Sequence, residues 1–455
     1  MTRFRLVLSY VLLVGTLAWC VPSAKAVDPF PDPPSPPPPV YVKAGHLFDA
    51  TSDNLRDKVV LVIEGERITR IAPASDIAIP SNAEVIDLSR AWVLPGLIDC
   101  HTHLSFRADQ YDPILEVKLT PFDYGFYAVV NAARTLQAGF TSVRDVGSPP
   151  FLAVDLRRTI DEGFIPGPRI VASGPPLSIT GGHGDLNGFA PAVSNSMYPA
   201  ERDFEIVDGP DQVRHVVRAQ VKYGVDVIKI LATGGVLSQG DKPGAEQLTY
   251  EEMKAAVEEA HRTGRKVAAH AHGAEGIKDA VRAGVDSIEH GSLIDAEGIA
   301  MMKSHGTYLV ADIYNDDYIL GKATEFGLPQ ENVDKEKMLG RLQRENFSKA
   351  AATGVKIAFG TDAGVYPHGD NARQFRYMVK FGMTPAAAIR SATSSAADLI
   401  DRARDLGTLE AGKYADLIAV TANPLDHVEA LEHVAFVMKG GKVYKDELAA
   451  KSSTR

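Results

Sequence analysis

The chain has 455 residues, of which 45% are hydrophobic and 23% are charged, as is usual for a globular protein. This length exceeds what a single core normally fills, although α/β barrels are an accepted exception. The formal net charge of −10 gives no support for nucleic acid or an anionic membrane as a partner.

The first 26 residues have the pattern of a secretory signal peptide. Arg3 and Arg5 precede a mainly apolar stretch from Leu6 to Leu17, and an A-x-A site ends at Ala26. The apolar stretch is shorter than the ~20 residues that a membrane span needs. We therefore expect cleavage after Ala26, a periplasmic or secreted protein, and no stable membrane insertion. The mature chain would carry a net charge of −13, because the peptide contains three basic residues and no acidic one.

The chain beyond this segment divides into regions that differ in composition and in the pattern of apolar residues. Residues 27–40 form a proline-rich leader, which we expect to be extended. Short alternating segments between residues 41 and 90 predict β-strands, and the same pattern returns between residues 405 and 448. We therefore expect the two regions to combine into one small β-sandwich domain, with residues 91–404 inserted between them.

The insertion alternates apolar runs with amphipathic helical stretches, which is the pattern of βα units around a parallel sheet. Eight segments are strand candidates: Val93–His103, Thr141–Val146, Arg169–Ser173, Val227–Leu231, Lys266–His270, Ser287–His290, Tyr308–Ala311 and Lys356–Gly360. Eight repeats over about 300 residues predict a (β/α)8 TIM barrel. A doubly wound sheet is the alternative, although it rarely gives so long a series.

A pair of histidines, His101 and His103, ends the first of these strands. Alternate side chains of a strand point to one face, so both imidazoles project together and offer half of a site for zinc or a similar divalent metal. Catalytic groups of such barrels gather at the carboxyl ends of the strands. The other strands supply Lys229, His270, His272, His290 and Asp362 at or near their ends, and His183 and His368 lie in loops beyond strands. The single cysteine of the mature chain, Cys100, is expected to be a small buried residue beneath this site.

The charge of such a site requires an explanation for Lys229. Two neighbouring divalent cations repel each other and need anionic bridges, of which Asp362 supplies one. A lysine ammonium cannot ligate a metal, and burying it beside two cations is very unfavourable. A deprotonated Lys229 can add carbon dioxide and form a carbamate, which is a bridging anion. The alternative is a lysine whose ammonium reaches solvent at the end of the strand.

Several motifs resemble those of the amidohydrolase superfamily over nearly the whole mature chain. They read VLPGLIDCHTHL, GFTSVRDVG, VIKILATGG, HAHG, IEHG, GTDAG and LGTLEAGKYADLIAV. Within the superfamily the chain is similar to the branch that contains Xaa-Pro and Xaa-Arg dipeptidases and ochratoxin-hydrolysing amidases. The resemblance implies a (β/α)8 barrel with a composite β-sandwich and a binuclear zinc centre. The ligands that it implies are His101, His103, N6-carboxylated Lys229, His270, His290 and Asp362.

Our mechanistic hypothesis is that a hydroxide bridging the two metals attacks an amide carbonyl, while Asp362 passes a proton to the leaving nitrogen. The resemblance implies that His183 polarises the scissile carbonyl and that His272 contacts substrate, with metal ligation by His272 left open. A substrate carboxylate needs a cation or hydrogen-bond donors. His272, His368 and Arg373 are the candidates for this role.

These expectations define an exported amidohydrolase that cleaves N-acyl amino acids or small dipeptides in the manner of a carboxypeptidase or prolidase. The expected reactions include the conversion of ochratoxin A to ochratoxin alpha and phenylalanine. A cyclic amide or lactone hydrolase resembling imidazolonepropionase would use the same ligands with different loops. A non-catalytic scaffold is the third alternative, but it would be expected to have lost ligands. A homo-oligomer is expected only because relatives often form one.

Overall fold

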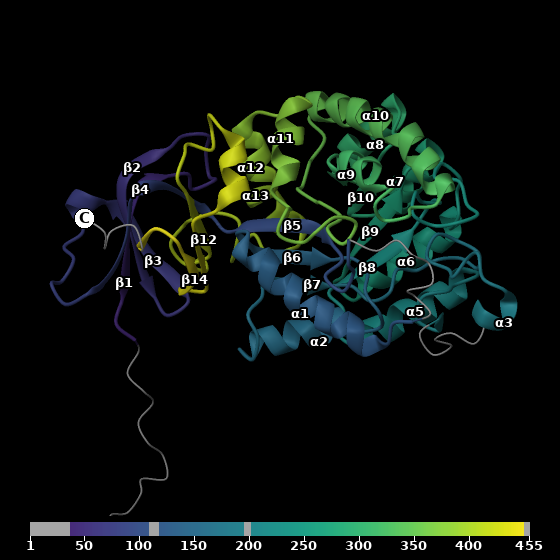
Figure 1. Cartoon of the computed structure of the whole chain (residues 1–455), viewed down its shortest axis with the longest axis horizontal. Coiled ribbons are helices and arrows are strands. Elements are labelled where there is room, and N and C mark those ends of the chain that lie inside the picture. Colours follow the sequence, from purple (N-terminus) through teal and green to yellow (C-terminus); the bar gives the residue numbers. More distant parts are fainter. Residues whose placement is uncertain (1–36, 109–117, 195–201, 450–455) are drawn as a thin grey trace, which may run out of the picture. The chain divides into compact units, whose positions relative to one another are not determined.

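Strands from both ends of the chain pair in one seven-stranded sheet, drawn in purple and yellow in Figure 1. The computed structural model describes residues 37–108, 118–194 and 202–449, so the expected signal peptide and most of the leader lie outside the described residues. The sheet consists of β1 (Val40–Leu47), β2 (Arg56–Glu64), β3 (Arg67–Pro73), β4 (Glu84–Pro95), β12 (Leu417–Val420), β13 (Phe436–Lys439) and β14 (Lys442–Asp446). Its strand order is β14-β13-β12-β4-β1-β2-β3.

The expected β-sandwich is therefore one continuous sheet rather than two separate ones. Strand β4 is 12 residues long, which lets it pair in parallel with β1 from Glu84 and antiparallel with β12 through Pro95. Apolar residues from both chain ends, including Val42, Leu61 and Phe436, share one core of this sheet. The two regions combine as predicted, but they form a single sheet, because the central strand β4 pairs with β1 on one side and with β12 on the other.

Seven of the eight predicted strands of the insertion are confirmed, although the predicted strand Val93–His103 is divided, because its first three residues belong to β4. Strands β5 (Leu97–Thr102), β6 (Phe140–Asp145) and β7 (Arg169–Ala172) form a parallel three-stranded sheet. Strands β8 (Val227–Leu231), β9 (Lys266–Ala271), β10 (Ser287–His290) and β11 (Tyr308–Val310) form a parallel four-stranded sheet. An isolated parallel bridge between Leu177 and Ile230 lies between the two sheets.

The eighth predicted strand, Lys356–Gly360, is not a regular strand. Its neighbours are those expected, because the amide of Leu309 donates to Lys356 at 2.8 Å and the amide of Cys100 donates to Phe359 at 2.8 Å. The amide of Phe359, however, donates to Ser391 at the end of a helix rather than to a neighbouring strand. This exchange of partners interrupts the ladder and leaves a TIM-barrel-like arrangement with isolated bridges at this point.

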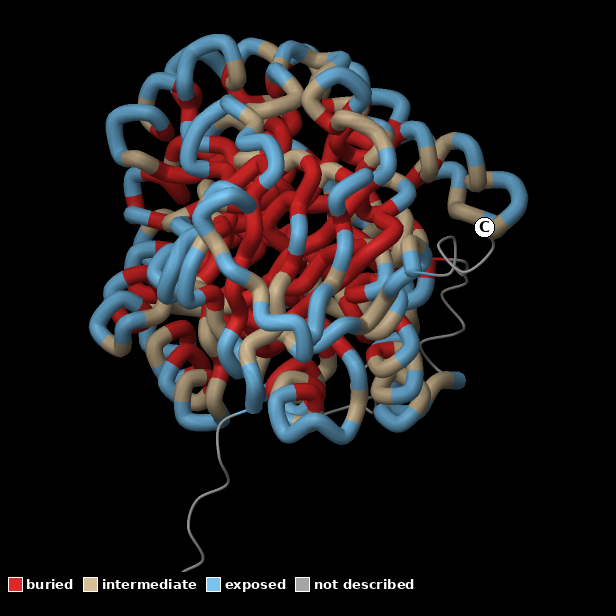
Figure 2. Tube along the Cα trace, turned by 90° about the vertical axis from the view of Figure 1, so that its left-hand side faces the viewer, coloured by how far each residue is buried: buried red, intermediate tan, exposed pale blue. Residues whose placement is uncertain are grey.

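Helices follow most of these strands and surround them in Figure 1, while Figure 2 shows buried chain concentrated in the interior. They are α1 (Pro121–Gln137), α2 (Leu152–Asp161), α3 (Pro191–Ser194), α5 (Pro210–Lys222), α6 (Tyr250–Arg262), α7 (Ala274–Ala283), α8 (Ala296–His305), α9 (Asn315–Lys322), α10 (Gln330–Thr353), α11 (Arg373–Lys380), α12 (Pro385–Ser391) and α13 (Ser394–Leu399). Short 3-10 helices span Ala74–Asp76 and Val428–His433. Among the described helices, none is both long and apolar enough to cross a membrane.

The sequence explains both the strands and the helices of the insertion locally. All six residues of β5 and of β6 are buried, as expected for parallel strands that are covered on both faces. Helix α6 begins with a capping box in which Thr249 and Glu252 each bond the other's backbone amide. These elements hold the carboxyl ends of the strands on one side, where the predicted site residues lie.

Candidate metal centre

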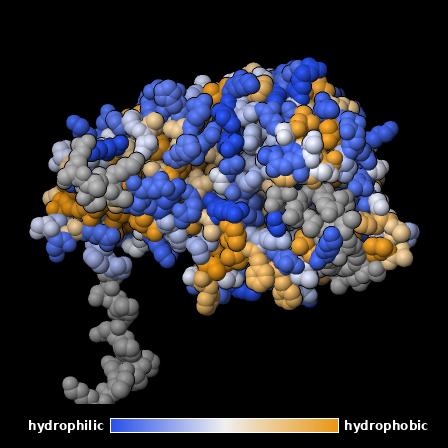
Figure 3. Space-filling model, viewed as in Figure 1, coloured by the Kyte–Doolittle hydropathy of each residue, from blue (hydrophilic) through white to orange (hydrophobic). Residues whose placement is uncertain are grey.

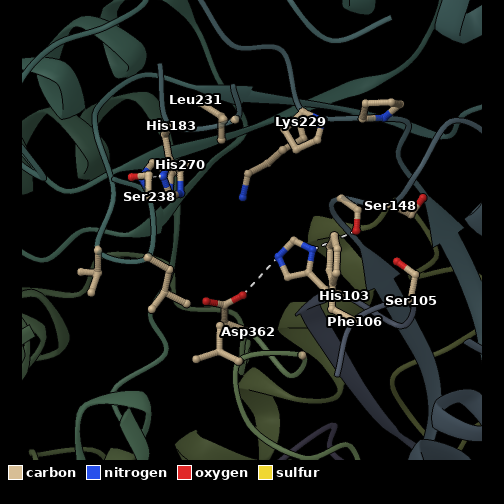
Figure 4. Close-up of a pocket in the computed structure, with 18 of the residues that line it drawn as sticks. His103, Ser105, Phe106, Ser148, His183, Lys229, Leu231, Ser238, His270 and Asp362 are labelled. Carbon is tan, nitrogen blue, oxygen red and sulfur yellow. Dashed lines mark hydrogen bonds and ion pairs between the residues drawn. The ribbon is translucent and has the colours of Figure 1, made fainter. Parts of the chain in front are cut away.

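The carboxyl ends of the strands meet at a cavity of about 590 Å³. Figure 4 shows side chains from several of these strand ends converging on it. The predicted residues that line the cavity are His101, His103, His183, Lys229, His270, His272, His290 and Asp362. The structure therefore brings together side chains that are up to 261 positions apart in the sequence only because the strands are parallel and adjacent.

Three overlapping groups of donors lie close enough to hold a metal ion, with ligand atoms of each group within 4.8 Å of one another. The groups are His101, His103 and Asp362; His290, Asp312 and Asp362; and His270, His272 and His290. The Oδ1 atom of Asp362 lies 3.1 Å from Nε2 of His103 and 3.4 Å from Nε2 of His101. Because Asp362 and His290 each belong to two groups, the donors form one continuous cluster.

Backbone strain is concentrated at the two shared donors. His290 has a φ of 68° and Asp362 a φ of 57°, in the left-handed region that residues with a side chain rarely occupy. Each such conformation costs on the order of 1–3 kcal/mol and persists where the surrounding structure imposes it. The strain at both positions is consistent with a site that requires these two side chains in fixed places.

The imidazoles are held by acceptors on the side away from the cavity. Nδ1 of His101 lies 2.8 Å from Glu289, Nδ1 of His290 lies 2.9 Å from Asp312, and Nδ1 of His103 lies 2.9 Å from the carbonyl of Gly147. A carboxylate or carbonyl only accepts, so each Nδ1 donates, and in the neutral ring the lone pair is then on Nε2, which faces the cavity side. Metal-ligating histidines have this arrangement, in which the second nitrogen is anchored to a carboxylate or carbonyl.

Lys229 lies within this cluster and does not reach solvent. Only 2% of its surface is exposed, and its amine extends into the cavity between His270 and Asp362 in Figure 4. Burial lowers the pKa of Lys229 to about 8, so its uncharged amine is far more populated near neutral pH than that of an ordinary lysine. This burial contradicts the alternative in which the ammonium of Lys229 reaches solvent. The uncharged amine is instead available to form a carbamate.

The remaining imidazoles are kept neutral by their surroundings. Burial, together with neighbouring histidines, lowers the pKa of His270 and of His272 well below its usual value. The His270 ring lies 4.6 Å from that of His290 and 4.7 Å from that of His272, measured between ring centroids. Neutral imidazoles are the form that binds divalent metals, so the electrostatics and the donor geometry agree.

His272 is held by Ser292 and His183 by Ser238, each with Nδ1 at 2.7 Å from the hydroxyl oxygen. Both rings line the cavity, as expected, and His183 stacks on His270 with centroids 4.4 Å apart. His272 also belongs to a donor group, so its alternative role as a metal ligand stays open. Gly235 allows the position of His183, because a Cβ there would lie 2.0 Å from the ring.

The tautomer of His183 follows from a chain of hydrogen bonds. Ser238 lies 2.7 Å from the carboxylate of Asp241, to which it must donate because a carboxylate only accepts. The Ser238 oxygen then accepts from Nδ1 of His183, and Nε2 of the neutral ring has no proton to donate. Burial lowers the pKa of His183 to about 4, although Asp241 opposes this effect. Polarising a carbonyl from Nε2 therefore requires a second proton on His183.

The structure does not bring His368 or Arg373 into the described lining of the cavity. His368 is buried between Thr135 and the carbonyl of His103, which its Nε2 contacts at 3.1 Å, so it supports the backbone of a donor residue. Arg373 lies in a separate surface groove and pairs with Asp370 at 3.3 Å. Neither side chain is among the described lining residues, so a substrate contact by His368 or Arg373 stays a prediction.

Several functional neighbours were not identified from the sequence. Asp312 directly follows the predicted strand Tyr308–Ala311, so its position at a strand end was a usable signal. Glu289 and its partner Arg144 are buried behind His101, and no spacing pattern indicates that pairing. Glu336, on α10, lines the cavity from a helix far along the chain from the strand-end motifs.

The donor set fits divalent metal binding. It combines neutral imidazoles with anionic carboxylates, in a pocket where the histidine side chains are already oriented by other residues. The cavity walls are largely apolar or aromatic, with Phe106, Tyr124 and Phe189 among the lining residues. Such a combination of a metal-binding floor and apolar walls is typical of a site for a small organic substrate.

The chain has relatives of known activity over most of its length. It is 34% identical to the ochratoxinase of Aspergillus niger over 420 residues, covering 89% of this chain and 86% of that protein. A crystal structure of a Xaa-Pro dipeptidase with bound methionine is 40% identical, has a TM-score of 0.84, and is matched over 90% of this chain and 100% of that chain. A prolidase complexed with N-methylphosphonate-L-proline is 32% identical, with a TM-score of 0.82 and coverage of 90% and 100%.

A model of the amidohydrolase family matches residues 92–444, which is well over half of the chain. The match includes the strands β5–β11 and the residues of the donor cluster. The resemblance found in the motifs is thus confirmed: the chain belongs to the amidohydrolase family and is a hydrolase.

Proposed function

We propose that this protein hydrolyses the amide bond of small dipeptides and N-acyl amino acids and releases the C-terminal amino acid. The cavity supports this proposal most directly, because it places the donor cluster at the floor of an accessible space of about 590 Å³. The relatives described as ochratoxinase, Xaa-Pro dipeptidase and prolidase support the same substrate class. Hydrolysis of ochratoxin A to ochratoxin alpha and phenylalanine falls within it.

The proposed cofactor is a pair of divalent metal ions, with zinc as the first candidate. His101 and His103 with Asp362 would hold one ion, and His270 with His290 the other. Lys229, carboxylated on its side-chain nitrogen, would supply the anionic bridge that four neutral imidazoles lack. Bound there, the metals would polarise the amide carbonyl and lower the pKa of water to about 7.

The protein's own residues supply proton transfer and orientation. The Asp362 carboxylate is suited to accept a proton from the attacking water and to return it to the leaving nitrogen, because amide cleavage requires protonation of the amine. Burial raises the pKa of Asp362, but the interactions with His101 and His103 outweigh this effect and keep the pKa well below its usual value, so the carboxylate is ionised and able to accept a proton. His183 would bind the developing negative charge only after gaining a second proton, which burial opposes and Asp241 favours through Ser238.

Arginine side chains on the described cavity lining are suited to bind the substrate carboxylate in place of His368 and Arg373. Arg107 follows β5, and Arg202 lies between β7 and α5, where it pairs with Asp185 at 2.6 Å. Arginine binds carboxylates through two parallel hydrogen bonds, which fixes the orientation of the leaving amino acid.

A substrate panel with the zinc-loaded protein tests the proposed function. The panel contains N-acyl amino acids, Xaa-Pro and Xaa-Arg dipeptides, ochratoxin A, and a cyclic amide and a lactone, with amino acid release as the measurement. Chelator-reversible release from linear amides supports the proposal. Hydrolysis of only the cyclic compounds would favour the imidazolonepropionase-like alternative, and no hydrolysis with full metal occupancy would favour a scaffold.

The domain organisation and the export of the protein are part of the same proposal. The eight segments around the cavity would form a closed (β/α)8 barrel within residues 91–404, and residues 41–90 and 405–448 would form the attached domain. A signal peptide cleaved after Ala26 would export the enzyme. N-terminal sequencing of protein recovered from the periplasm or medium tests the cleavage site, since an intact leader there would contradict it.

A further inference from the structure

Glu336 is a buried carboxyl group in the cavity wall that has no partner in the described part of the chain. It lies on α10, only 5% of its surface is exposed, and it lines the cavity. Other cavity carboxylates are paired: Asp185 with Arg202 at 2.6 Å, Asp312 with His290 at 2.9 Å, and Asp362 with His103 at 3.1 Å. Burying such a group without a partner is unfavourable, so its presence at this wall requires an explanation.

The same wall contains a buried hydrogen-bond acceptor that has no donor among the described residues. The amide nitrogen of Asn315, at the start of α9, lies 2.6 Å from Asp312 and 3.4 Å from Asp362. Since both partners only accept, the orientation of the Asn315 amide is fixed. Its oxygen is buried without a partner. A group that binds beside this wall is therefore expected to bring donors, not acceptors.

The packing of α10 on α9 concentrates negative charge near Glu336. Helix α10 approaches α9 closely at Gly340, where a Cβ would lie 2.1 Å from a carboxylate oxygen of Asp316. Burial, and then the charges of Asp316 and Asp312, raise the pKa of Glu336 to about 8, although the charge of Arg344, which pairs with Asp316 at 2.9 Å, opposes this shift. A positive charge placed in the cavity at this wall would relieve that repulsion and stabilise ionised Glu336.

Positive and negative groups lie along different parts of the cavity rim. Arg202 follows β7, whereas Asn315 and Glu336 follow β11, and three strands separate β7 from β11 in the order of the sheets. A substrate carboxylate beside Glu336 would meet the charges of Asp312 and Asp316, so a neutral Glu336 that donates to a carboxylate is the less favourable arrangement. The rim thus offers one pole for an anion and another for a cation.

We infer that Glu336 determines substrate specificity by binding a protonated amine on the acyl part of the substrate, so that amides carrying an ammonium group are preferred over uncharged N-acyl amino acids. This inference rests on the proposed function and names the substrate class of the same site. The ammonium comes either from the α-amine of a dipeptide or from a basic side chain, and both present the same N–H donors to the carboxylate.

Matched substrates test this inference with the zinc-loaded enzyme. Alanyl-phenylalanine is compared with propionyl-phenylalanine, which lacks only the α-amine. N-acetyl-lysyl-phenylalanine is compared with N-acetyl-norleucyl-phenylalanine, which lacks only the side-chain amine. In one of the two pairs, the amine is the group that Glu336 binds. For that pair, kcat/KM of the wild type is expected to be roughly 10- to 100-fold higher for the ammonium compound, as for a hydrogen bond between charged groups. Which pair shows the preference identifies the source.

Glu336→Gln is expected to bring that ratio close to one by lowering kcat/KM for the ammonium compound alone. Glu345→Gln is the matched control, because Glu345 lies on the same helix but is exposed and pairs with Arg341. An unchanged preference in Glu336→Gln, or no preference in the wild type for either pair, overturns the inference.

A binding measurement keeps this test separate from that of the proposed function. Calorimetry compares alaninamide with propionamide, and lysine-derived with norleucine-derived N-acetyl amides, on the wild type. Tighter binding of the ammonium compound in either pair supports the inference even if no amide is cleaved, a result that would overturn only the proposed function. Equal binding in both pairs overturns the inference. Because this measurement uses only the wild type, it decides the question even if Glu336→Gln does not fold.

Discussion

The carboxylate of Glu289 lies 2.8 Å from Nδ1 of His101, directly behind the cavity floor. Its other oxygen lies 2.8 Å from the guanidinium of Arg144, and all three side chains are buried. Although burial opposes ionisation, Arg144 and His101 lower the pKa of Glu289 well below its usual range. A permanent anion therefore fixes the proton of His101 on Nδ1 and turns Nε2 toward Asp362.

Glu289→Gln should weaken metal binding without removing any ligand. The amide can no longer accept a charge-assisted hydrogen bond with the same strength, so the His101 ring loses its fixed orientation. Loss of such an outer partner typically lowers metal affinity roughly 10- to 100-fold. Competition with a chromogenic chelator measures this, with Glu258→Gln on the exposed face of α6 as control. Unchanged affinity in Glu289→Gln would show that the ion pair serves stability alone.

Asp362→Asn should separate metal binding from turnover. Its amide oxygen can still ligate, but it does not accept a proton as a carboxylate does. We expect metal content to remain substantial while kcat falls roughly 10²- to 10⁴-fold, the range of a lost general acid–base group. Metal analysis and steady-state kinetics check both parts, with Asp370→Asn outside the main cavity as control. Near-normal turnover in the metal-loaded variant would refute the proton-transfer role.

The carbamate on Lys229 is directly observable. Reconstitution of the metal-free protein with zinc and ¹³C-labelled bicarbonate should produce a carbamate carbon resonance, because burial lowers the pKa of Lys229 to about 8 and favours the reactive amine. Lys229→Met should lack this resonance and bind less metal, since the bridging anion is lost. Lys266→Met, at the half-buried start of β9, is the control. A wild-type spectrum without the resonance would exclude the carbamate.

Most residues of the metal centre could be predicted because they lie at the carboxyl ends of barrel strands. Residues that alternate on a buried strand and end it, such as His101, His103 and Lys229, could be assigned because β-strand periodicity and barrel topology together determine where they point. The contact of His368 with Thr135 on α1 could not be predicted, because no periodicity of the sequence encodes the path of its loop.

The sequence also lacked a signal for partners that depend on packing between helices. Glu336 looks like an ordinary charged residue of an amphipathic helix, and only the close approach of α10 and α9 at Gly340 buries it. The single continuous sheet formed by the chain ends was missed for a related reason. Alternation predicts strands, but the length over which β4 pairs with both β1 and β12 depends on register.

The stability of the metal-free protein should depend on pH through Glu336. Burial raises the pKa of this carboxyl from 4.5 to about 8 in the folded state, so the folded chain holds its proton more tightly than the unfolded chain does. The contribution of Glu336 to stability is therefore greatest below pH 4.5, decreases as the pH rises toward 8, and then levels off. Glu336→Gln removes this dependence.

The measurement is the free energy of unfolding in urea for wild type and Glu336→Gln, with chelator present. We expect the variant to gain roughly 1–3 kcal/mol relative to wild type between pH 5 and pH 8. Glu345→Gln, on the exposed side of the same helix, should show no such gain. Parallel curves for wild type and Glu336→Gln would mean that Glu336 titrates normally.

An exposed apolar stripe on α1 supports the expected homo-oligomer. Phe122, Phe126 and Val130 follow one another at intervals of four residues, with 78%, 70% and 48% of their surfaces exposed. Residues at this spacing lie on one face of a helix, and Figure 3 shows hydrophobic side chains gathered over α1 and α2. A contiguous apolar face of this kind is typical of a surface that binds another protein chain.

Phe126→Asp should therefore reduce the size of the assembly in sedimentation velocity, because the carboxylate would have to be desolvated in the interface. The active site lies at the strand ends, so activity per metal-loaded chain should change little unless assembly is needed for the fold. Val443→Asp, at an exposed position on β14, is the control for adding charge to an apolar surface residue. A wild type that sediments as a monomer at all concentrations would contradict the oligomer, and an unchanged assembly in Phe126→Asp would move the interface to another face.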